Sequence, residues 1–457
     1  MSRTLEIARL RKPRHPLIFI PGFLGSKLRD QRTGRVLWGN MSNILTHDHC
    51  DRLACPLNPG DSGSQDDLEA FALYESLWGV EYYRKTLRIL KEAGGYRLGD
   101  IANPAPGDNA FVFVYDWRKD IAETTGRFAQ TLERLQTSLG GSRVTFDIVA
   151  HSQGGLIARY YALYGGKDVL QQEDPLPDGA GAARLNKVIL VGTPNQGTLE
   201  AMKILHLGLK KGFMPMDPSV TFTMPALYQM LPPPAAVHFS SLDGTPVHMD
   251  LYDPDLWQRQ KLSVFSPTSQ DEIARKIRLQ GGGADSLLER NDEYRDFLQR
   301  QLARARRFQT ALEAPAPAGK VPVFYAFGSD CVPTLKTAVA IEEKGETKIY
   351  FDQGRYRRDP VGERIDKLLY GAGDGTVLME SLLALPEILE GEDPAGVRGP
   401  LALSSAFFVC DSHGLLTNNP IFQNNLLYLL LYEQDAAAPP APALALDGSP
   451  GYLKDAR

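Results

Sequence analysis

The sequence contains no apolar run long enough to cross a lipid bilayer. A membrane-spanning helix needs roughly 18 consecutive apolar residues, whereas the longest apolar stretches here are short, such as residues 426–432. The basic residues up to Arg14 are followed only by the apolar patch 17–20. A signal peptide needs roughly 7 to 15 apolar residues and a small-residue cleavage site. We therefore expect neither a membrane span nor a secretion signal.

Cysteine is scarce, and basic residues are not in excess. Four cysteines in 457 residues are too few for a disulfide framework, so we expect free thiols and a cytoplasmic location. The 50 basic and 55 acidic residues give a net charge of −5. This balance argues against nucleic-acid binding, because nucleic-acid-binding proteins normally carry a basic excess. A chain of this length that is 43% hydrophobic can bury a sizeable core.

Short apolar runs recur along the chain, and each stops at glycine or at turn residues. Helical patterns lie between them: the apolar positions after Asp120 fall on one helix face until Gly140, and residues 154–164 and 419–432 also fit helices. Continuous apolar strands flanked by helices are typical of a mostly parallel sheet that is covered on both faces. The predicted strands are 17–20, 111–115, 144–149, 187–191, 321–327 and 406–409. Cys331 and Cys410 end the last two of these strands, which should neighbour each other, so the two side chains could be close in space, although two small buried thiols are the simpler interpretation.

Two long stretches interrupt this alternation of strands and helices. Helical and proline-rich segments replace the strand pattern between about 200 and 320, which predicts a cap inserted into one loop of the sheet. The polar, glycine-rich stretch of about 26–75 is a second excursion and a candidate lid. We expect one domain over residues 15–434, preceded by an extension over 1–14. Residues 435–457 are rich in alanine and proline, which predicts a disordered tail.

The segment 150–155 (AHSQGG) lies between a predicted strand and a predicted helix. This is the context of a nucleophile elbow, whose pattern is G-x-S-x-G. The strained turn requires small neighbours two residues from the serine; Gly154 satisfies this requirement, and Ala150 replaces the first glycine with only one extra methyl group. The alternative is a serine that merely caps a helix. Because strand, turn and helix occur in register, we favour Ser152 as a nucleophile.

A serine nucleophile needs a base and an acid, which follow it in the order Ser…Asp/Glu…His in α/β hydrolases. Of the eight histidines, only His413 lies beyond the late acidic candidates and directly after the last predicted strand. Asp374 lies in a tight glycine turn that can direct a carboxylate at an imidazole, so we favour it as the acid. Asp330, directly after strand 321–327, is the alternative, whereas Asp411 is too close in sequence to His413.

Acyl transfer also needs hydrogen-bond donors for the developing oxyanion. The Gln153 N–H is one candidate, because it opens a helix where backbone amides have no partner. The second is expected in the loop after the first strand, PGFLGS (21–26), where Phe23 has the best-placed amide. A Pro-Gly turn is common by itself, but together with a nucleophile elbow it is stronger evidence for an oxyanion loop.

Taken together, these segments resemble the lecithin:cholesterol acyltransferase family, which includes acyltransferases and phospholipases. The resemblance covers residues 15–432 as separate islands, and it implies an α/β-hydrolase fold with helices on both faces of the sheet. It also implies Ser152 as nucleophile, Asp374 as acid, His413 as base, and Phe23 and Gln153 as oxyanion donors. The islands are PGFLGSKL (21–28), YDWR (115–118), the elbow, GTPNQG (192–197), GDGTV (373–377) and His413.

The family also has an active-site lid after the first strand, which a disulfide holds in secreted members. Residues 26–75 would be its counterpart. Cys50 and Cys55 lie within this stretch, but they are much closer together than in the secreted pattern.

The expected function is serine-dependent acyl transfer from a lipid ester through an acyl-serine intermediate, either to a lipid alcohol or to water. The alternatives are a carboxylesterase or amidase of small soluble substrates and a non-catalytic binding module on a hydrolase scaffold. We expect no cofactor. We also expect no metal, because the spacing of His47, His49, Cys50 and Cys55 matches no zinc arrangement.

Two further features concern contact with lipid. The arginine-rich helical stretch 295–307 could make a transient contact with a membrane surface, although a solvated helix face explains it more simply. Trp78, Tyr82 and Tyr83 could line an acyl groove, although most such aromatic residues belong to a core.

Overall fold

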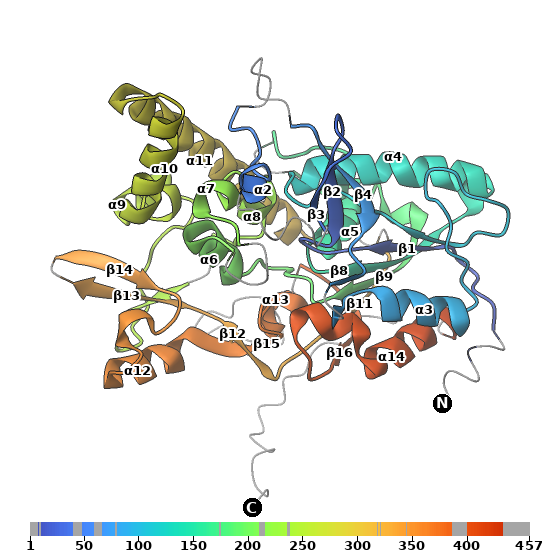
Figure 1. Cartoon of the computed structure of the whole chain (residues 1–457). Helices are drawn as coiled ribbons and strands as arrows, with labels where there is room; N and C mark the ends of the chain where they lie inside the picture. Colours follow the sequence, from blue (N-terminus) through green and yellow to red (C-terminus); the bar gives the residue numbers. More distant parts are fainter. Residues whose placement is uncertain are drawn as a thin grey trace, which may run out of the picture.

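A computed structural model describes most of the chain, and the architecture is built on one parallel sheet (Figure 1). The expected tail, 435–457, and most of the expected N-terminal extension lie outside the described residues. The described residues are 8, 11–39, 48–58, 66–77, 80–172, 175–209, 215–234, 238–317, 319, 321–343, 345–385 and 400–432.

The central sheet has six strands in the order β16-β11-β9-β8-β1-β7, and every neighbouring pair is parallel. All six strands predicted from the sequence are present, each displaced by at most a few residues. The inner strands are mostly apolar because both faces of the sheet are covered. The strands are β1 (Leu17–Ile20), β7 (Ala110–Val112), β8 (Phe146–His151), β9 (Leu185–Val191), β11 (Val323–Gly328) and β16 (Leu403–Phe408).

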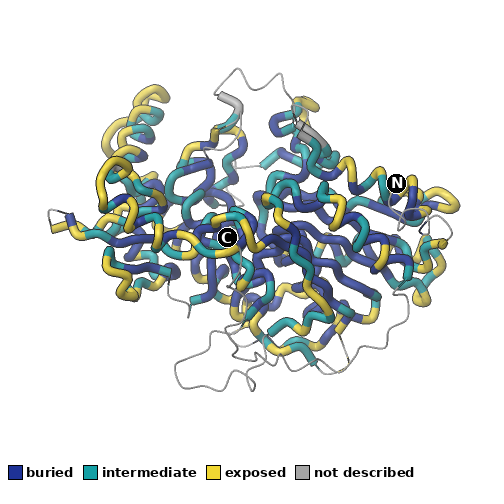
Figure 2. Tube along the Cα trace, turned by 90° about the horizontal axis from the view of Figure 1, so that it is seen from below, coloured by how far each residue is buried: buried dark blue, intermediate teal, exposed yellow. Residues whose placement is uncertain are grey.

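Helices cover both faces of this sheet, α4 on one side and α3 and α14 on the other (Figure 1). Successive side chains of a strand point to opposite faces. Ile18 and Ile20 of β1 accordingly join the core under α4 and α5, whereas Leu17 and Phe19 join the core under α3 and α14. Figure 2 shows the buried residues concentrated along the strands. These helices are α3 (Arg84–Glu92), α4 (Ile121–Leu139), α5 (Gln153–Tyr164) and α14 (Pro420–Leu431).

The stretch between β9 and β11, expected to form the cap, is largely helical. Four of its helices have proline at one of their first two positions, where the missing N–H costs nothing. They are α7 (Pro218–Thr221), α8 (Pro225–Gln229), α9 (Pro254–Arg259) and α10 (Pro267–Leu279). Among the described residues of this stretch, α6 (Leu199–Leu207) and α11 (Ala284–Glu313) are further helices.

Two regions differ from the sequence-based expectation. The stretch expected as a lid loop contains a three-stranded antiparallel sheet, β3-β2-β4, formed by Val36–Trp38, Ser26–Asp30 and Leu68–Leu73, beside the short helix α2 (Asp48–Asp51). A hairpin of β5 (Ser76–Leu77) and β6 (Val80–Glu81) follows it.

A second insertion, which the sequence reading missed, lies between β11 and β16. In it, β12 (Val332–Leu335) pairs with β15 (Tyr370–Gly373), and β13 (Ala338–Glu343) pairs with β14 (Glu346–Tyr350). Helix α12 (Pro360–Leu369) precedes β15, and α13 (Met379–Leu383) follows it. Strand β10 (Phe239–Ser240) from the first insertion pairs with β13, which joins the two insertions.

Candidate active site

Ser152 occupies the sharp turn between β8 and α5, as an elbow requires. Its backbone has φ 54° and ψ −125°, a strained conformation for a residue with a side chain. Gly154 is required beneath this turn, because a Cβ atom there would lie 2.6 Å from the Pro21 carbonyl oxygen. The small residues at 150 and 154 thus allow β8 and α5 to pack tightly against β1 while the turn exposes the serine hydroxyl to the site.

The structure brings His413 and Asp374 to this serine. His413 Nε2 lies 2.9 Å from Ser152 Oγ, and His413 Nδ1 lies 2.7 Å from Asp374 Oδ2. The His413 N–H also donates to the Asp374 carbonyl at 2.8 Å, so main chain and side chain both join the two residues. The alternative acid, Asp330, is exposed after β11, and the carboxylate in contact with the imidazole is that of Asp374.

The Asp374 carboxylate is held in its ionised form. Burial alone would raise its pKa, but the His413 ring and its hydrogen bond, together with the amides of Val377 and Thr376, keep the pKa below its ordinary value. Those amides donate to Oδ1 at 2.7 and 3.0 Å, which leaves Oδ2 for the imidazole. The carboxylate can therefore fix the ring with its proton on Nδ1 and a lone pair directed at the serine.

The amides of Phe23 and Gln153 lie in the two backbone segments that flank Ser152. Within the described part of the chain, neither N–H has a protein acceptor. Side chains hold the loop that carries Phe23: Tyr115 Oη donates to the Pro21 carbonyl at 2.8 Å, and Trp117 Nε1 donates to the Ser26 carbonyl at 3.0 Å. A rigid loop with a free amide is the arrangement that oxyanion stabilisation needs.

Ser152 and His413 open into a cavity of about 330 Å³ with largely apolar walls. The cavity is bounded by the loop after β1, by aromatic residues of the 26–83 region, and by α6 and α8 of the insertion between β9 and β11. Tyr82 and Tyr83 line it, while Trp78 lies outside the described residues. Its other lining residues include Leu24, Trp38, Tyr74, Thr198, Glu200, Ala201, Ile204, Leu209, Leu227, Met230 and Val377.

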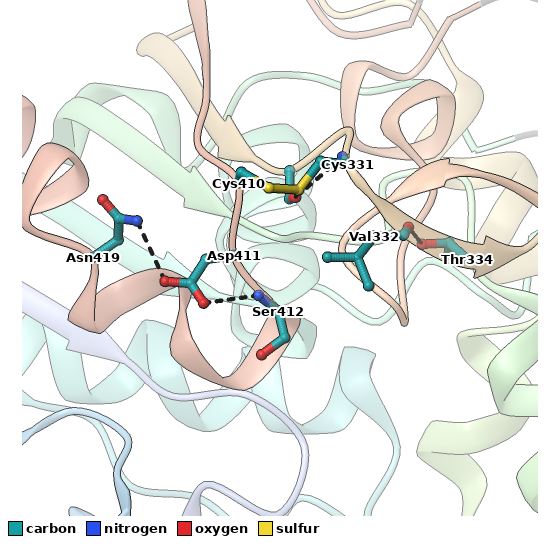
Figure 3. Close-up of a disulfide and its surroundings, with 8 residues drawn as sticks. Cys331, Val332, Thr334, Cys410, Asp411, Ser412 and Asn419 are labelled. Atoms are coloured by element: carbon teal, nitrogen blue, oxygen red, sulfur yellow. Dashed lines mark hydrogen bonds between the residues drawn. A yellow bond between two sulfur atoms is a disulfide. The ribbon is translucent and has the colours of Figure 1, made fainter.

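Cys331 and Cys410 form a disulfide beside the site, so the expectation of free thiols is wrong for this pair (Figure 3). The adjacent parallel strands β11 and β16 end at the same sheet edge, and the two Cα atoms lie 5.5 Å apart. Cys50 and Cys55 are free. Because disulfides are rare in the reducing cytosol, the bond argues against the expected cytoplasmic location.

This disulfide joins the segments that carry Asp374 and His413. Val332, next to Cys331, pairs with Gly373 and bridges to Asp374. Cys410 lies three residues before His413, and between them Asp411 accepts hydrogen bonds from the Ser412 amide and the Asn419 side chain (Figure 3). The bond therefore limits how far the acid and histidine segments can separate.

Replacing both Cys331 and Cys410 with serine should lower the free energy of unfolding by about 2–4 kcal/mol, because the bond closes a loop with a sequence separation of 79. Urea unfolding without reductant measures the change, and Cys50→Ser, which removes a free thiol, is the control. Equal midpoints for the double variant and the wild type would contradict the expected stabilisation.

The remaining sequence-predicted features contribute little to this site. His47 lies outside the described residues, and within the described ranges no group of three or more His, Cys, Asp or Glu side chains could hold a metal. The arginines of 295–307 bond within the protein; Arg304, for example, pairs with Asp120 and Asp168. No helix among the described residues is long and apolar enough to cross a membrane.

Comparison with known families agrees with this architecture. The family model described as lecithin:cholesterol acyltransferase matches residues 105–383, more than half of the chain. The chain belongs to the lecithin:cholesterol acyltransferase family. The match includes Ser152 and Asp374 and ends before His413. No curated protein matches the sequence.

Three solved structures are similar to this family member to different degrees. The structure titled "The crystal structure of Tle4-Tli4 complex" matches with a TM-score of 0.54 and 14% identity, over 91% of this chain and 97% of that one. EstA from Clostridium botulinum matches with a TM-score of 0.34 and 13% identity, over 94% and 90% of the two chains. The propeptide form of the Bacillus licheniformis lipase BlEst2 has a TM-score of 0.32 and 11% identity, over 94% and 52%. The central parallel sheet, its helices and the first of these likenesses establish an α/β-hydrolase fold.

Proposed function

We propose that this protein transfers an acyl group from a lipid ester to Ser152 and then to water or to a lipid alcohol. The observation that carries the proposal is the hydrogen-bonded series Ser152–His413–Asp374 at the mouth of an apolar cavity. Family membership supports ester hydrolysis or acyl transfer on lipids in general. The size and apolar walls of the cavity favour a long acyl chain over a small soluble ester.

The geometry supports the following sequence of steps. His413 Nε2 removes the Ser152 proton as Oγ attacks the acyl carbonyl, and the ionised Asp374 stabilises the imidazolium that forms. The Phe23 and Gln153 amides donate to the oxyanion of the tetrahedral intermediate. Collapse of the intermediate leaves acyl-Ser152, with the alcohol leaving group protonated by His413. The acceptor, water or a lipid alcohol, then repeats the steps in reverse order.

Product analysis tests this proposal. A phospholipid with a labelled acyl chain is supplied in vesicles, with and without a long-chain alcohol. Labelled fatty acid identifies water as the acceptor, and a labelled fatty ester identifies the alcohol. A wild-type protein that releases no labelled product under either condition, yet cleaves short soluble esters, would favour the small-ester alternative.

The cavity wall should set the preference for chain length. Each buried methylene contributes about 0.8 kcal/mol, so kcat/KM should rise with chain length until the cavity is full. Ile204, half-buried on α6, lines the cavity, and Ile204→Trp would fill part of it. We expect a loss of kcat/KM of about tenfold or more for a dodecanoyl ester, with little change for an acetyl ester, in assays with p-nitrophenyl esters.

Leu207→Trp is the matched control for this experiment. Leu207 is half-buried on the same helix but does not line the cavity. Its substitution should therefore leave the ratio of long-chain to short-chain activity unchanged. If Ile204→Trp also left that ratio unchanged, the acyl chain would not occupy this cavity.

A further inference from the structure

A continuous set of hydrogen bonds links the loop that carries Phe23 to the backbone of His413. The Gly22 N–H donates to Tyr83 Oη at 3.1 Å, and Tyr83 Oη lies 2.9 Å from His151 Nδ1. His151 Nε2 lies 3.1 Å from the His413 carbonyl oxygen. Tyr83 and His151 are both buried, so bulk water competes little for these contacts.

Elementary hydrogen-bond rules fix the direction of every bond in this series. A carbonyl oxygen only accepts, so His151 Nε2 must carry the proton, and Nδ1 of the neutral ring must then accept. Tyr83 consequently donates to Nδ1, and its oxygen accepts the Gly22 N–H. Burial, and then the proximity of His413, lowers the pKa of His151 to about 3, in agreement with a neutral ring. A neutral His151 with its proton on Nε2 thus gives every donor and acceptor in this series a hydrogen-bond partner.

The series meets the candidate reaction centre at both ends. Gly22 directly precedes Phe23, the proposed oxyanion donor, and it packs so closely that a Cβ atom there would lie 2.7 Å from Ser152 Cβ and 3.0 Å from His151 Nδ1. At the other end, the His151 ring lies against the His413 ring with centroids 4.8 Å apart. Tyr83 and His151 therefore contact the oxyanion loop, the nucleophile elbow and the histidine segment together.

We propose that Tyr83 and His151 are positioning residues that hold the Phe23 amide and the His413 imidazole at their working distances from Ser152. This inference rests on the proposed function. Neither side chain needs to exchange a proton with substrate, because Tyr83 acts through the Gly22 peptide and His151 acts through the His413 carbonyl. A structural role alone would affect stability, whereas a positioning role affects kcat at constant substrate binding.

Tyr83→Phe is the first test. It keeps the aromatic wall of the cavity but leaves the Gly22 N–H without its acceptor and His151 Nδ1 without its donor. We expect kcat for a long-chain p-nitrophenyl ester to fall about 10- to 100-fold, the size of effect that a small misplacement of reacting groups produces, with KM nearly unchanged. The control is Tyr160→Phe, which also removes a buried phenol that accepts a backbone N–H, from Val169 at 3.1 Å, away from the site.

Substitutions of His151 separate the two ends of the series. Gln can place a donor near the position of Nε2, Asn can place an acceptor near that of Nδ1, and Leu can do neither. We expect His151→Gln and His151→Asn each to retain more kcat than His151→Leu. Adding Tyr83→Phe to His151→Leu should cost little more, because groups that act as one unit have non-additive effects.

The outcomes distinguish this inference from the proposed function. A wild-type protein that neither cleaves esters nor reacts with a fluorophosphonate would overturn the proposed function and this inference with it. An active wild type with an unchanged kcat in Tyr83→Phe would overturn only the positioning role. If Tyr83→Phe does not fold, the His151 series decides: equal kcat in the Gln, Asn and Leu variants overturns the role, and partial rescue by Gln or Asn supports it.

Discussion

Replacing Ser152 with alanine is expected to lower kcat by about 10⁶-fold, the loss seen when the nucleophile of a serine hydrolase is removed. The substitution deletes the oxygen that forms the acyl-enzyme. Alanine should still adopt the φ of 54° at this position, because β8 and α5 fix the turn. Ester hydrolysis and labelling by a fluorophosphonate measure the effect. The wild type should be labelled and Ser152→Ala should not.

Ser263 provides a matched control for this substitution. It is also buried and also has a positive φ, 55°, but it lies in the insertion between β9 and β11, outside the cavity wall. Ser263→Ala should cost stability, because Ser263 Oγ donates to the Leu205 carbonyl, and it should leave labelling intact. If Ser152→Ala were labelled as strongly as the wild type, Ser152 would not be the nucleophile, and a non-catalytic scaffold would become the better interpretation.

The central sheet could be predicted because its strands are buried on both faces and therefore carry a strong local signal. Strand β1, with the sequence LIFI, is apolar and buried at every position, as a strand covered on both faces of a parallel sheet requires. The three proposed triad residues could be located for a related reason: each follows a strand or a glycine turn with a distinctive pattern. The structure brings Ser152, Asp374 and His413 together, and their catalytic roles stay predictions.

The smaller sheets could not be predicted because their signal is not local. Strand β2 has the sequence SKLRD, with alternate residues buried, and its partner β4 starts 42 positions after β2 begins. Such pairing depends on packing between distant segments rather than on residue preference. β12 pairs with β15 across a similar distance, and this pairing is what delivers Asp374 to His413.

The disulfide shows what kind of information the composition alone omits. Four cysteines in a long chain indicate free thiols on average, yet Cys331 and Cys410 follow two strands that lie side by side. The sequence indicated that these strands are neighbours, but it did not show their register, which brings the two Cα atoms to 5.5 Å. Sequence reasoning likewise noted Tyr83 only as a cavity aromatic, because its hydrogen bonds reach residues 61 and 68 positions away.

Asp374→Asn is expected to lower kcat about 10⁴-fold, as the corresponding change does in serine proteases, and the structure supplies the reason. The Thr376 and Val377 amides both donate to Oδ1, so the asparagine carbonyl oxygen should take that position and its NH₂ group should face His413 Nδ1. That NH₂ group can only donate, which forces the imidazole proton onto Nε2. Nε2 then cannot accept the Ser152 proton.

Asp330→Asn is the matched control for this prediction. Asp330 is exposed after β11, so this variant should retain normal turnover. Steady-state ester hydrolysis compares the two variants, and the opposite result, with the loss in Asp330→Asn, would transfer the acid role to Asp330.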